Sequence, residues 1–522
     1  MNTIPPHQLQ AMLHDGSEIA LLDVREAGQF GESHPLFATP LPYSRLELDI
    51  SGLVPRKSVR VVLCDDGHSN VAALAARRLE AIGYGDVAVL TGGTAGWKAA
   101  GHRLFAGVNV PSKAFGELVE HAYHTPRVTA SELAAMREAG EDVVILDGRP
   151  YAEYRKMSIP GSVCCPNAEL AYRAATLVKN PRTKIVVNCA GRTRSIIGAQ
   201  TLIDVGIPNP VYALENGTQG WYLADLPLEH GASRRYPDAV DEATLPALRD
   251  RARASMKRHG VAFVGAAAAQ QWLDDPRRST YLLDVRTPEE YAAGSLPGAV
   301  HAAGGQLIQA TDQWVGVRNA RLLLVDHEGV RAPIVASWLR QLGCDAHVLE
   351  GGIAARVRAT PPAAPRLPEL PAISAAELNE ALSSSEVSVL DLGPSMRFRQ
   401  AHIPGSRWSI RPRVVDDARH AGRDIVLVAD DPSIACAAAV DLLEAGYARV
   451  KRLEGGLAAW TKGGLPTAAS PDIPPDDECI DYLFFVHDRH AGNKAAMRQY
   501  LAWETGLVAQ LDERDRSAFR IE

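Results

Sequence analysis

The chain has 522 residues, of which 46% are hydrophobic and 22% are charged, as in soluble globular proteins with several domains. Its formal net charge of -7 provides no basic excess of the kind that indicates a nucleic-acid partner. The N-terminus lacks a basic segment followed by an apolar one, and no apolar run approaches the ~20 residues that span a bilayer, so we expect a cytoplasmic protein without a signal peptide or membrane segment.

A pattern of strands and helices occurs four times along the chain. Each copy opens with an apolar strand that ends near an Asp, at residues 21–25, 145–149, 282–286 and 389–393. Three copies continue to a Pro-Gly corner, at residues 160–161, 297–298 and 404–405. A second β-branched strand follows in every copy, over Val59–Leu63, Ile185–Asn188, Leu322–Val325 and Ile425–Val428. An Ala-rich helix and a short strand with a Gly turn close each copy, which predicts a mainly parallel sheet flanked by helices.

The repeats and their linkers predict four domains, at residues 1–106, 107–232, 233–360 and 361–470, followed by a C-terminal tail at residues 471–522. The linker before the third domain is expected to be helical over Ala243–Lys257, and a stiff Pro-rich linker begins at Pro361. Helical periodicity over Ala495–Leu511 predicts a tail helix that docks on a neighbouring domain or subunit.

The second copy places Cys189 where a buried strand meets the N-terminal end of a helix-like segment that starts at Ser195. Backbone N–H groups and cationic side chains at such a position lower a cysteine pKa and favour a reactive thiolate. The loop Ala190-Gly191-Arg192-Thr193-Arg194 is expected to form an anion nest of N–H groups, with either guanidinium binding a sulfonate or carboxylate. The hydroxyls of Thr193 and Ser195 are further donors, although an N-cap equally explains Ser195.

The other copies differ at the position of this cysteine. Cys189 lies 42 residues after Asp147 and 17 residues before the glycine that ends its helix. The same two counts reach Asp326 in the third copy, and the count from the helix end reaches Ala429 in the fourth. Neither residue can carry sulfur as a persulfide.

The first copy contains Cys64, which lies 41 residues after Asp23 but 19 residues before Gly83. Counting 17 residues back from Gly83 reaches Asp66 instead. The loop around Cys64 has two carboxylates and no Arg, and negative charge disfavours a thiolate. We therefore interpret Cys64 as a strand-end residue of a degenerate copy.

Together, the strand ending in Asp-x-Arg, the Pro-Gly corner, the Cys-x-x-x-x-Arg loop and the closing Gly turn resemble rhodanese-type sulfurtransferases, in four tandem domains. The resemblance implies the α/β rhodanese fold and a Cys189 persulfide that passes sulfane sulfur from an anionic donor such as thiosulfate to cyanide or a thiol. It also implies that Asp147 and Arg149 support the active loop. Related Cys-based phosphatases have five residues between Cys and Arg, whereas four separate Cys189 from Arg194 here, which favours sulfur transfer over phosphatase or arsenate reductase activity.

Alternatives remain open for the donor and for the role of the degenerate copies. The donor could instead be 3-mercaptopyruvate or glutathione persulfide, although two Arg in the loop favour a dianion. The copies without cysteine could form a scaffold or an interaction surface in sulfur relay. The expected partners are the small-molecule donor and acceptor, with a homo-oligomer or a relay protein left open.

Other polar residues receive structural interpretations. Arg173 could reach the mouth of the pocket, but a surface position is the simpler interpretation. Cys164 and Cys165 are adjacent, and such cysteines bond each other only with strain, so we expect core residues rather than a resolving thiol. His68, His327, His487 and His490 are isolated, no Cys/His group has metal-ligand spacing, and no nucleotide-binding glycine motif occurs, so no metal or cofactor is predicted.

Overall fold

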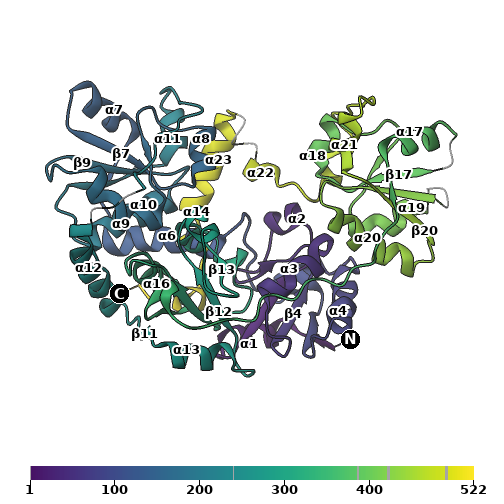
Figure 1. The fold of residues 1–522 in the computed structure, drawn as a ribbon, viewed down its shortest axis with the longest axis horizontal. Helices are drawn as coiled ribbons and strands as arrows, with labels where there is room; N and C mark the ends of the chain where they lie inside the picture. Colours follow the sequence, from purple (N-terminus) through teal and green to yellow (C-terminus); the bar gives the residue numbers. More distant parts are fainter. Residues whose placement is uncertain are drawn as a thin grey trace. The chain divides into compact units, whose positions relative to one another are not determined.

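The computed structural model describes residues 2–238, 240, 242–384, 387–419, 424–487, 489 and 492–521, so His490 lies outside the described residues. The chain divides into two compact units. One consists of Met1–His14, Ala20–Val108 and Ala363–His487, and contains domains 1 and 4 (Figure 1). The other consists of Asp15–Ile19, Asn109–Pro362 and Asp488–Glu522, and contains domains 2 and 3 with the end of the tail.

Within the described residues, each domain has one five-stranded sheet, and all four sheets have the same strand order. In domain 2 this order is β6-β10-β9-β7-β8, with parallel pairing throughout. The strands of domains 1 and 2 are β1 (Asn2–Ile4), β2 (Ile19–Asp23), β3 (Thr39–Pro40), β4 (Arg60–Cys64), β5 (Val87–Leu90), β6 (Arg127–Val128), β7 (Val143–Asp147), β8 (Val163–Cys164), β9 (Lys184–Asn188) and β10 (Val211–Leu214). Those of domains 3 and 4 are β11 (Phe263–Val264), β12 (Thr280–Asp284), β13 (Val300–His301), β14 (Arg321–Val325), β15 (Asp345–Leu349), β16 (Ala372–Ile373), β17 (Ser388–Asp391), β18 (Arg407–Trp408), β19 (Asp424–Val428) and β20 (Arg449–Leu453).

Helices flank each sheet (Figure 1). Domain 1 has α1 (Pro6–His14), α2 (Ala27–Glu32), α3 (Leu46–Leu53), α4 (Val71–Ala81) and α5 (Gly93–Ala99), and domain 2 has α6 (Val110–Tyr123), α7 (Ala130–Glu138), α8 (Tyr151–Lys156), α9 (Asn167–Leu177), α10 (Thr193–Asp204) and α11 (Gly217–Leu223). Domain 3 has α12 (Leu245–Arg258), α13 (Ala266–Leu273), α14 (Pro288–Ala292), α15 (Gly304–Gln309) and α16 (Arg331–Gln341). Domain 4 has α17 (Ala375–Ser383), α18 (Ser395–Gln400), α19 (Val414–Ala418), α20 (Pro432–Glu444) and α21 (Gly456–Lys462), and the tail has α22 (Phe484–His487), α23 (Lys494–Thr505), α24 (Leu507–Gln510) and α25 (Glu513–Ser517).

The core of domain 2 lies on both faces of its central strand β9. Ile185 and Val187 pack on one face with Leu202 of α10, whereas Val186 packs on the other face with Trp221 of α11. Side chains alternate between the faces of a strand, so a run of β-branched residues suits a strand that is covered on both sides. This packing fixes the end of β9, where Cys189 follows.

The predicted α/β fold with four tandem parallel-sheet domains is confirmed. Two helix predictions need correction. The tail helix predicted as one element over Ala495–Leu511 is two helices, α23 and α24, which meet at Gly506. The segment at residues 107–127, which joins the first two repeats and for which no helix was predicted, contains the 14-residue helix α6.

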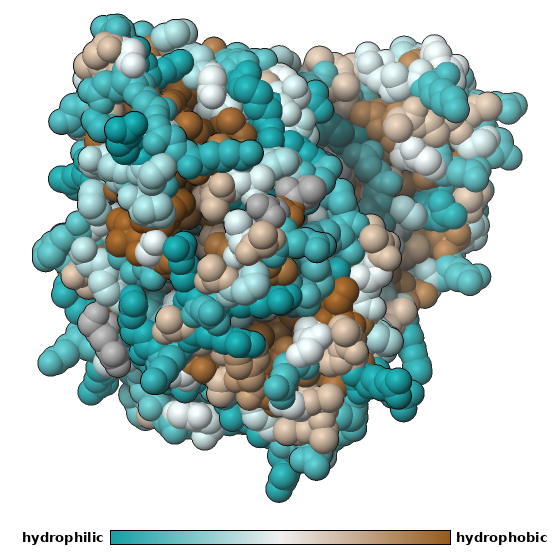
Figure 2. Space-filling model, turned by 60° about the vertical axis from the view of Figure 1, so that its left-hand side comes forward, coloured by the Kyte–Doolittle hydropathy of each residue, from teal (hydrophilic) through white to brown (hydrophobic). Residues whose placement is uncertain are grey.

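Figure 2 shows a face on which hydrophilic residues predominate, with apolar patches between them. None of the helices within the described ranges combines the length and the apolar character needed to cross a membrane.

Candidate active site

Cys189 directly follows β9 and is 2% exposed. Its carbonyl accepts hydrogen bonds from the backbone N–H of Thr218 at 2.8 Å and from the Thr218 hydroxyl at 2.9 Å. Its Sγ lies 3.6 Å from the Ser195 Oγ and donates a hydrogen bond to it. The thiol is thus held at the carboxyl edge of the sheet, where sites form in parallel α/β folds.

Asp147 and Arg149 form a buried ion pair beside this strand end. Arg149 Nη2 lies 2.7 Å from Asp147 Oδ2, and the two side chains are 2% and 0% exposed. The Asn188 side chain also donates to Asp147 Oδ2, at 2.8 Å. Asp147 therefore connects the opening strand of the domain to the residue that precedes Cys189.

The Arg192 guanidinium points to helix α6 and is 6% exposed. It donates to both carboxylate oxygens of Glu117, at 2.7 and 2.9 Å, and also pairs with Glu120. Burial lowers the pKa of Arg192, but the two carboxylates outweigh it and leave the pKa above its ordinary value. The positive charge of Arg192 is thus balanced by α6.

The Arg194 guanidinium pairs with Glu153 of α8 at 2.8 and 2.9 Å and donates to Gln306 of domain 3 at 3.1 Å. Domain 3 repeats this arrangement with Arg331, which pairs with Glu290 of α14 and with Glu169 of domain 2. Each of the two domains therefore contributes a polar side chain to the other domain's loop arginine.

Two backbone N–H groups of the loop are available to bind an acceptor. Within the described part of the chain, the backbone N–H groups of Arg192 and Thr193 have no hydrogen-bond acceptor. The helix begins at Thr193 rather than at Ser195, so the N-cap interpretation of Ser195 is wrong. The Ser195 hydroxyl instead donates to the Arg192 carbonyl at 2.7 Å, inside the first turn.

The C-terminal tail reaches this loop through helix α23. Glu504 is fully buried and accepts hydrogen bonds from the Thr193 hydroxyl at 2.9 Å and from the Lys113 ammonium at 3.0 Å. Burial raises the pKa of Glu504, but Lys113 and Thr193 outweigh it, so the pKa lies below its ordinary value. A Cβ on Gly191 would approach Glu504 Oε2 to 3.0 Å and the Tyr500 ring to 3.6 Å, so only glycine fits under the helix without displacement.

Sequence reasoning missed these acidic residues. Glu117 and Glu120 lie in a linker and Glu504 lies in the tail, all outside the repeat that identified the loop. The sequence contained one signal for two of them. Glu117 and Glu120 are three residues apart, which places both carboxylates on one face of a helix, where they can pair with the arginines of the loop.

The loop of domain 3 contains its own carboxyl group, Asp326, whose pKa is raised well above its ordinary value by burial and by the neighbouring Glu328. Asp326 occupies the position of Cys189, because its carbonyl accepts from Ile353 as that of Cys189 accepts from Thr218. The Asp326 carboxyl group accepts backbone N–H bonds from Gly329 at 2.9 Å and Val330 at 3.0 Å. By residue count they correspond to Arg192 and Thr193 of domain 2, whose N–H groups have no acceptor among the described residues. The backbone differs between the two loops, because the φ of Gly329 is 74° and that of Arg192 is −120°.

In domain 1 the residue at the position of Cys189 is Asp65, whereas the count from Gly83 predicted Asp66. The Asp65 carbonyl accepts from Thr94, and its carboxylate accepts from Gly67 at 2.9 Å. Cys64 is the last residue of β4, as predicted, and burial raises the pKa of its thiol well above the ordinary value. The segment from Asp65 to Gly83 is one residue longer than that from Cys189 to Gly206, which explains the wrong count.

Two further sequence-based interpretations have different outcomes. The surface position expected for Arg173 is wrong: the side chain is 3% exposed, pairs with Glu169 at 2.5 Å and lies 4.4 Å from the centre of the Tyr236 ring. Cys164 and Cys165 are free, buried core residues, as expected. Burial raises the pKa of Cys164 to about 12, which keeps its thiol protonated at neutral pH.

Comparison with known proteins identifies the repeated unit. A family model described as a rhodanese-like domain matches residues 5–100, 129–224, 266–359 and 374–463. A crystal structure described as thiosulfate sulfurtransferase from Pseudomonas aeruginosa is 44% identical, with a TM-score of 0.92 and coverage of 100% of this chain and 99% of that one. The Alr3790 protein of Anabaena sp. is 28% identical, over 19% of this chain and 82% of that one, with a TM-score of 0.18. Among curated proteins, the HTH-type transcriptional regulator Rv0324 of Mycobacterium tuberculosis is 38% identical over 105 residues, which are 20% of this chain and only 45% of that protein.

Proposed function

The chain belongs to the rhodanese family, and we propose that it is a sulfurtransferase whose catalytic residue is Cys189. The Cys189 thiolate attacks the outer sulfur of a donor such as thiosulfate. A bond forms between the two sulfurs while the sulfur–sulfur bond of the donor breaks, and sulfite leaves with the bonding electrons. A thiol or cyanide then attacks the outer sulfur of the persulfide, and Cys189 leaves as a thiolate.

The observation that carries this proposal is a pair of N–H groups, at Arg192 and Thr193, that have no acceptor in the part of the chain that the structure describes. Their counterparts by residue count in domain 3 donate to the Asp326 carboxyl group, which supports the interpretation that the N–H groups of this loop bind an acceptor. In domain 2 the same position lies next to Cys189. An anionic donor, and afterwards the charged persulfide, can take the place that the carboxyl group has in domain 3.

The paired guanidinium groups change the expected role of the two loop arginines. Arg192 and Arg194 are bound to carboxylates of α6 and α8, so their charge is largely neutralised. We assign anion binding mainly to the backbone N–H groups, and we assign to the arginines the shape of the loop. The preference for thiosulfate over 3-mercaptopyruvate or glutathione persulfide then rests on the similarity to the Pseudomonas aeruginosa enzyme. Domain 3, through Gln306, helps to hold the loop.

Mass spectrometry after incubation with thiosulfate tests the proposal. We expect one added sulfur atom, on a peptide that contains Cys189. Cys189→Ser should abolish both the added mass and thiocyanate formation, whereas Cys436→Ser, at a half-buried cysteine of domain 4, should change neither. Sulfur transfer that survives Cys189→Ser would contradict the proposal, and kcat/KM values for the three donors would rank them.

A further inference from the structure

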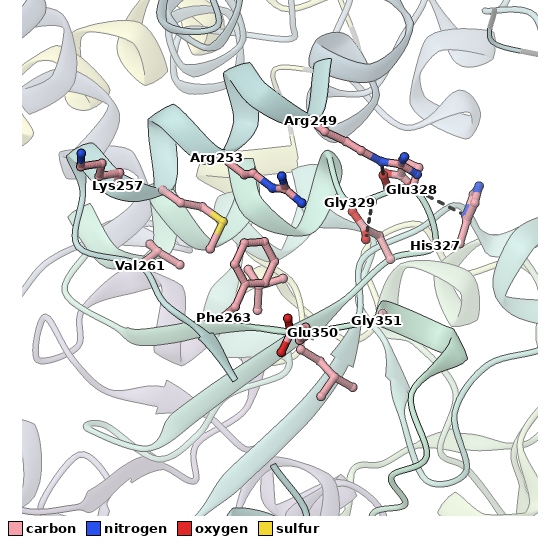
Figure 3. Close-up of a pocket in the computed structure, with 15 residues that line it drawn as sticks. Arg249, Arg253, Lys257, Val261, Phe263, His327, Glu328, Gly329, Glu350 and Gly351 are labelled. Atoms are coloured by element: carbon pink, nitrogen blue, oxygen red, sulfur yellow. Dashed lines mark hydrogen bonds and ion pairs between the residues drawn. The ribbon is translucent and has the colours of Figure 1, made fainter. Parts of the chain in front are cut away.

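A pocket of about 590 Å³ lies in domain 3, at the carboxyl edge of the sheet (Figure 3). It is lined by helix α12, by the loop that starts at Asp326 and by the turn that follows β15. Its volume is typical of sites for small molecules. The pocket takes no part in the sulfur-transfer mechanism proposed for Cys189.

The corresponding place in domain 2 is occupied. There α6, the catalytic loop and α11 meet helix α23, and Tyr500 and Glu504 approach Gly191. In domain 3, α12 packs on α16 as α6 packs on α10, so the two sites have the same framework. The position that α23 occupies on domain 2 corresponds to the open pocket in domain 3.

Helix α12 presents cations to this pocket. Arg249, Arg253 and Lys257 are spaced four residues apart, which places them on one face of the helix. The Arg249 side chain already has a partner, because its Nε donates to the Glu328 carbonyl at 2.7 Å. Arg253 and Lys257 are exposed and, among the described residues, have no hydrogen-bond or ion-pair partner.

The remaining lining is aromatic and acidic. Phe263 is 42% exposed, an unusual value for a large apolar side chain, and in Figure 3 Arg253 extends from α12 toward its ring. Glu350 lies on the side of Phe263 away from α12, and it is exposed. The pocket therefore combines two uncommitted cations, an open ring face and a hydrogen-bond acceptor.

We propose that this pocket binds a phosphate-bearing aromatic molecule of the nucleoside monophosphate type. The flat ring lies on Phe263, as aromatic rings pack face to face with an offset. The doubly charged phosphate lies between Arg253 and Lys257, because two cations one turn apart match a dianion better than a single carboxylate. Glu350 accepts a hydrogen bond from an amino or hydroxyl group of the ligand.

The loop of domain 3 directs the anion to α12. In domain 3 the N–H groups of Gly329 and Val330 are already bound to Asp326, so they cannot receive a further anion. Among the described residues that line the pocket, the cationic side chains without a partner are Arg253 and Lys257 of α12.

Calorimetric titration of the full-length protein with AMP tests the proposal, with adenosine and inorganic phosphate as partial ligands. We expect saturable binding of AMP, with each partial ligand at least tenfold weaker. Arg253→Ala combined with Lys257→Ala, and separately Phe263→Ala, should each weaken AMP binding at least tenfold. Arg251→Ala, at an exposed position of α12 outside the pocket, is the matched control and should leave it unchanged.

Several results would overturn the proposal. They are absence of AMP binding at millimolar concentration, AMP binding that survives the α12 and Phe263 substitutions, and phosphate binding as tight as that of AMP, which would indicate an anion site alone. Sulfur transfer by Cys189 should be unchanged in these variants, and a Tm equal to that of the parent protein shows that they are folded. The outcome is therefore independent of the sulfurtransferase proposal.

Discussion

Thr193, in the loop that follows Cys189, donates a hydrogen bond of 2.9 Å to Glu504, which lies 311 residues later in the chain. The same carboxylate binds the Lys113 ammonium on α6. One buried group therefore joins the loop, the linker helix and the tail. The domain that carries Cys189 is complete only when the tail is docked.

Replacing this carboxylate should loosen the tail and the loop together. Glu504→Gln leaves the Lys113 ammonium buried without its counter-charge, and breaking a buried ion pair in this way costs about 3–5 kcal/mol. We expect faster hydrogen exchange in α23 and in residues 190–194, a lower Tm and a kcat/KM for sulfur transfer at least tenfold lower.

Lys494→Met is the matched control for this substitution. Lys494 lies on the same helix and pairs with Asp225, whose side chain is 85% exposed. Exposed pairs contribute about 0–1 kcal/mol, so this variant should behave almost as the parent protein. Equal effects of the two substitutions would show that Glu504 does not hold the tail.

Glu153→Gln should strengthen binding of an anionic donor. Glu153 neutralises Arg194 at 2.8 Å, so its removal leaves one uncompensated positive charge beside the catalytic loop. We expect a KM for thiosulfate several-fold lower, with the difference shrinking as salt screens the charge. The measurement is KM and kcat at two ionic strengths.

Glu229→Gln serves as the control for Glu153→Gln, because Glu229 pairs with Arg234 at the surface of the same domain. It should leave KM unchanged at both ionic strengths. A KM for thiosulfate that does not respond to Glu153→Gln would show that the charge of Arg194 has no influence on the bound donor.

The repeat explains which parts of this site could be predicted. The strand, loop and helix around Cys189 are local, and their periodicity placed the cysteine at the carboxyl edge of a parallel sheet. The partners of the loop are not local. Glu117 and Glu504 come from segments outside the repeat, and only tertiary packing brings them to Arg192 and Thr193.

Counting residues also has a limit, which domain 1 shows. The count from Gly83 selected Asp66, whereas the backbone hydrogen bonds select Asp65. A loop tolerates one inserted residue at little energetic cost, so spacing from one end can be wrong by one. The backbone hydrogen bonds between the strand end and the closing turn decide which residue is equivalent to Cys189, and these bonds are visible only in the structure.

The ion pair between Glu290 and Arg331 should make stability depend on pH. Burial raises the pKa of Glu290, but Arg331 outweighs it and lowers the pKa from 4.5 to about 2. The folded state therefore favours the ionised form, so the contribution of this carboxylate is complete above the unfolded value of 4.5 and is lost as pH falls toward 2. We expect Glu290→Gln to lower the Tm at neutral pH and the difference from the parent to shrink over that acid range.

Glu289→Gln tests whether this pH dependence is specific. Glu289 is the preceding residue, and its side chain is 67% exposed. Its Tm should follow that of the parent at every pH. A Tm difference for Glu290→Gln that stays constant between pH 5 and about 2 would contradict the shifted pKa.

The final prediction concerns the buried carboxyl group of Asp326 in domain 3. Asp326→Ala removes the carboxyl group that accepts N–H bonds from Gly329, Val330 and Ala332 at 2.9, 3.0 and 2.9 Å. Buried N–H groups without an acceptor are costly, so hydrogen exchange at these three amides should accelerate and the Tm should fall.

An added oxyanion should reverse part of this loss. Sulfate can occupy the vacated nest and stabilise the variant by binding only its folded state. We expect sulfate to raise the Tm of Asp326→Ala more than that of the parent, and chloride at equal ionic strength to produce no such difference. If sulfate and chloride act alike, the loop does not form an anion site, and the corresponding argument for the Arg192 and Thr193 amides in domain 2 loses its support.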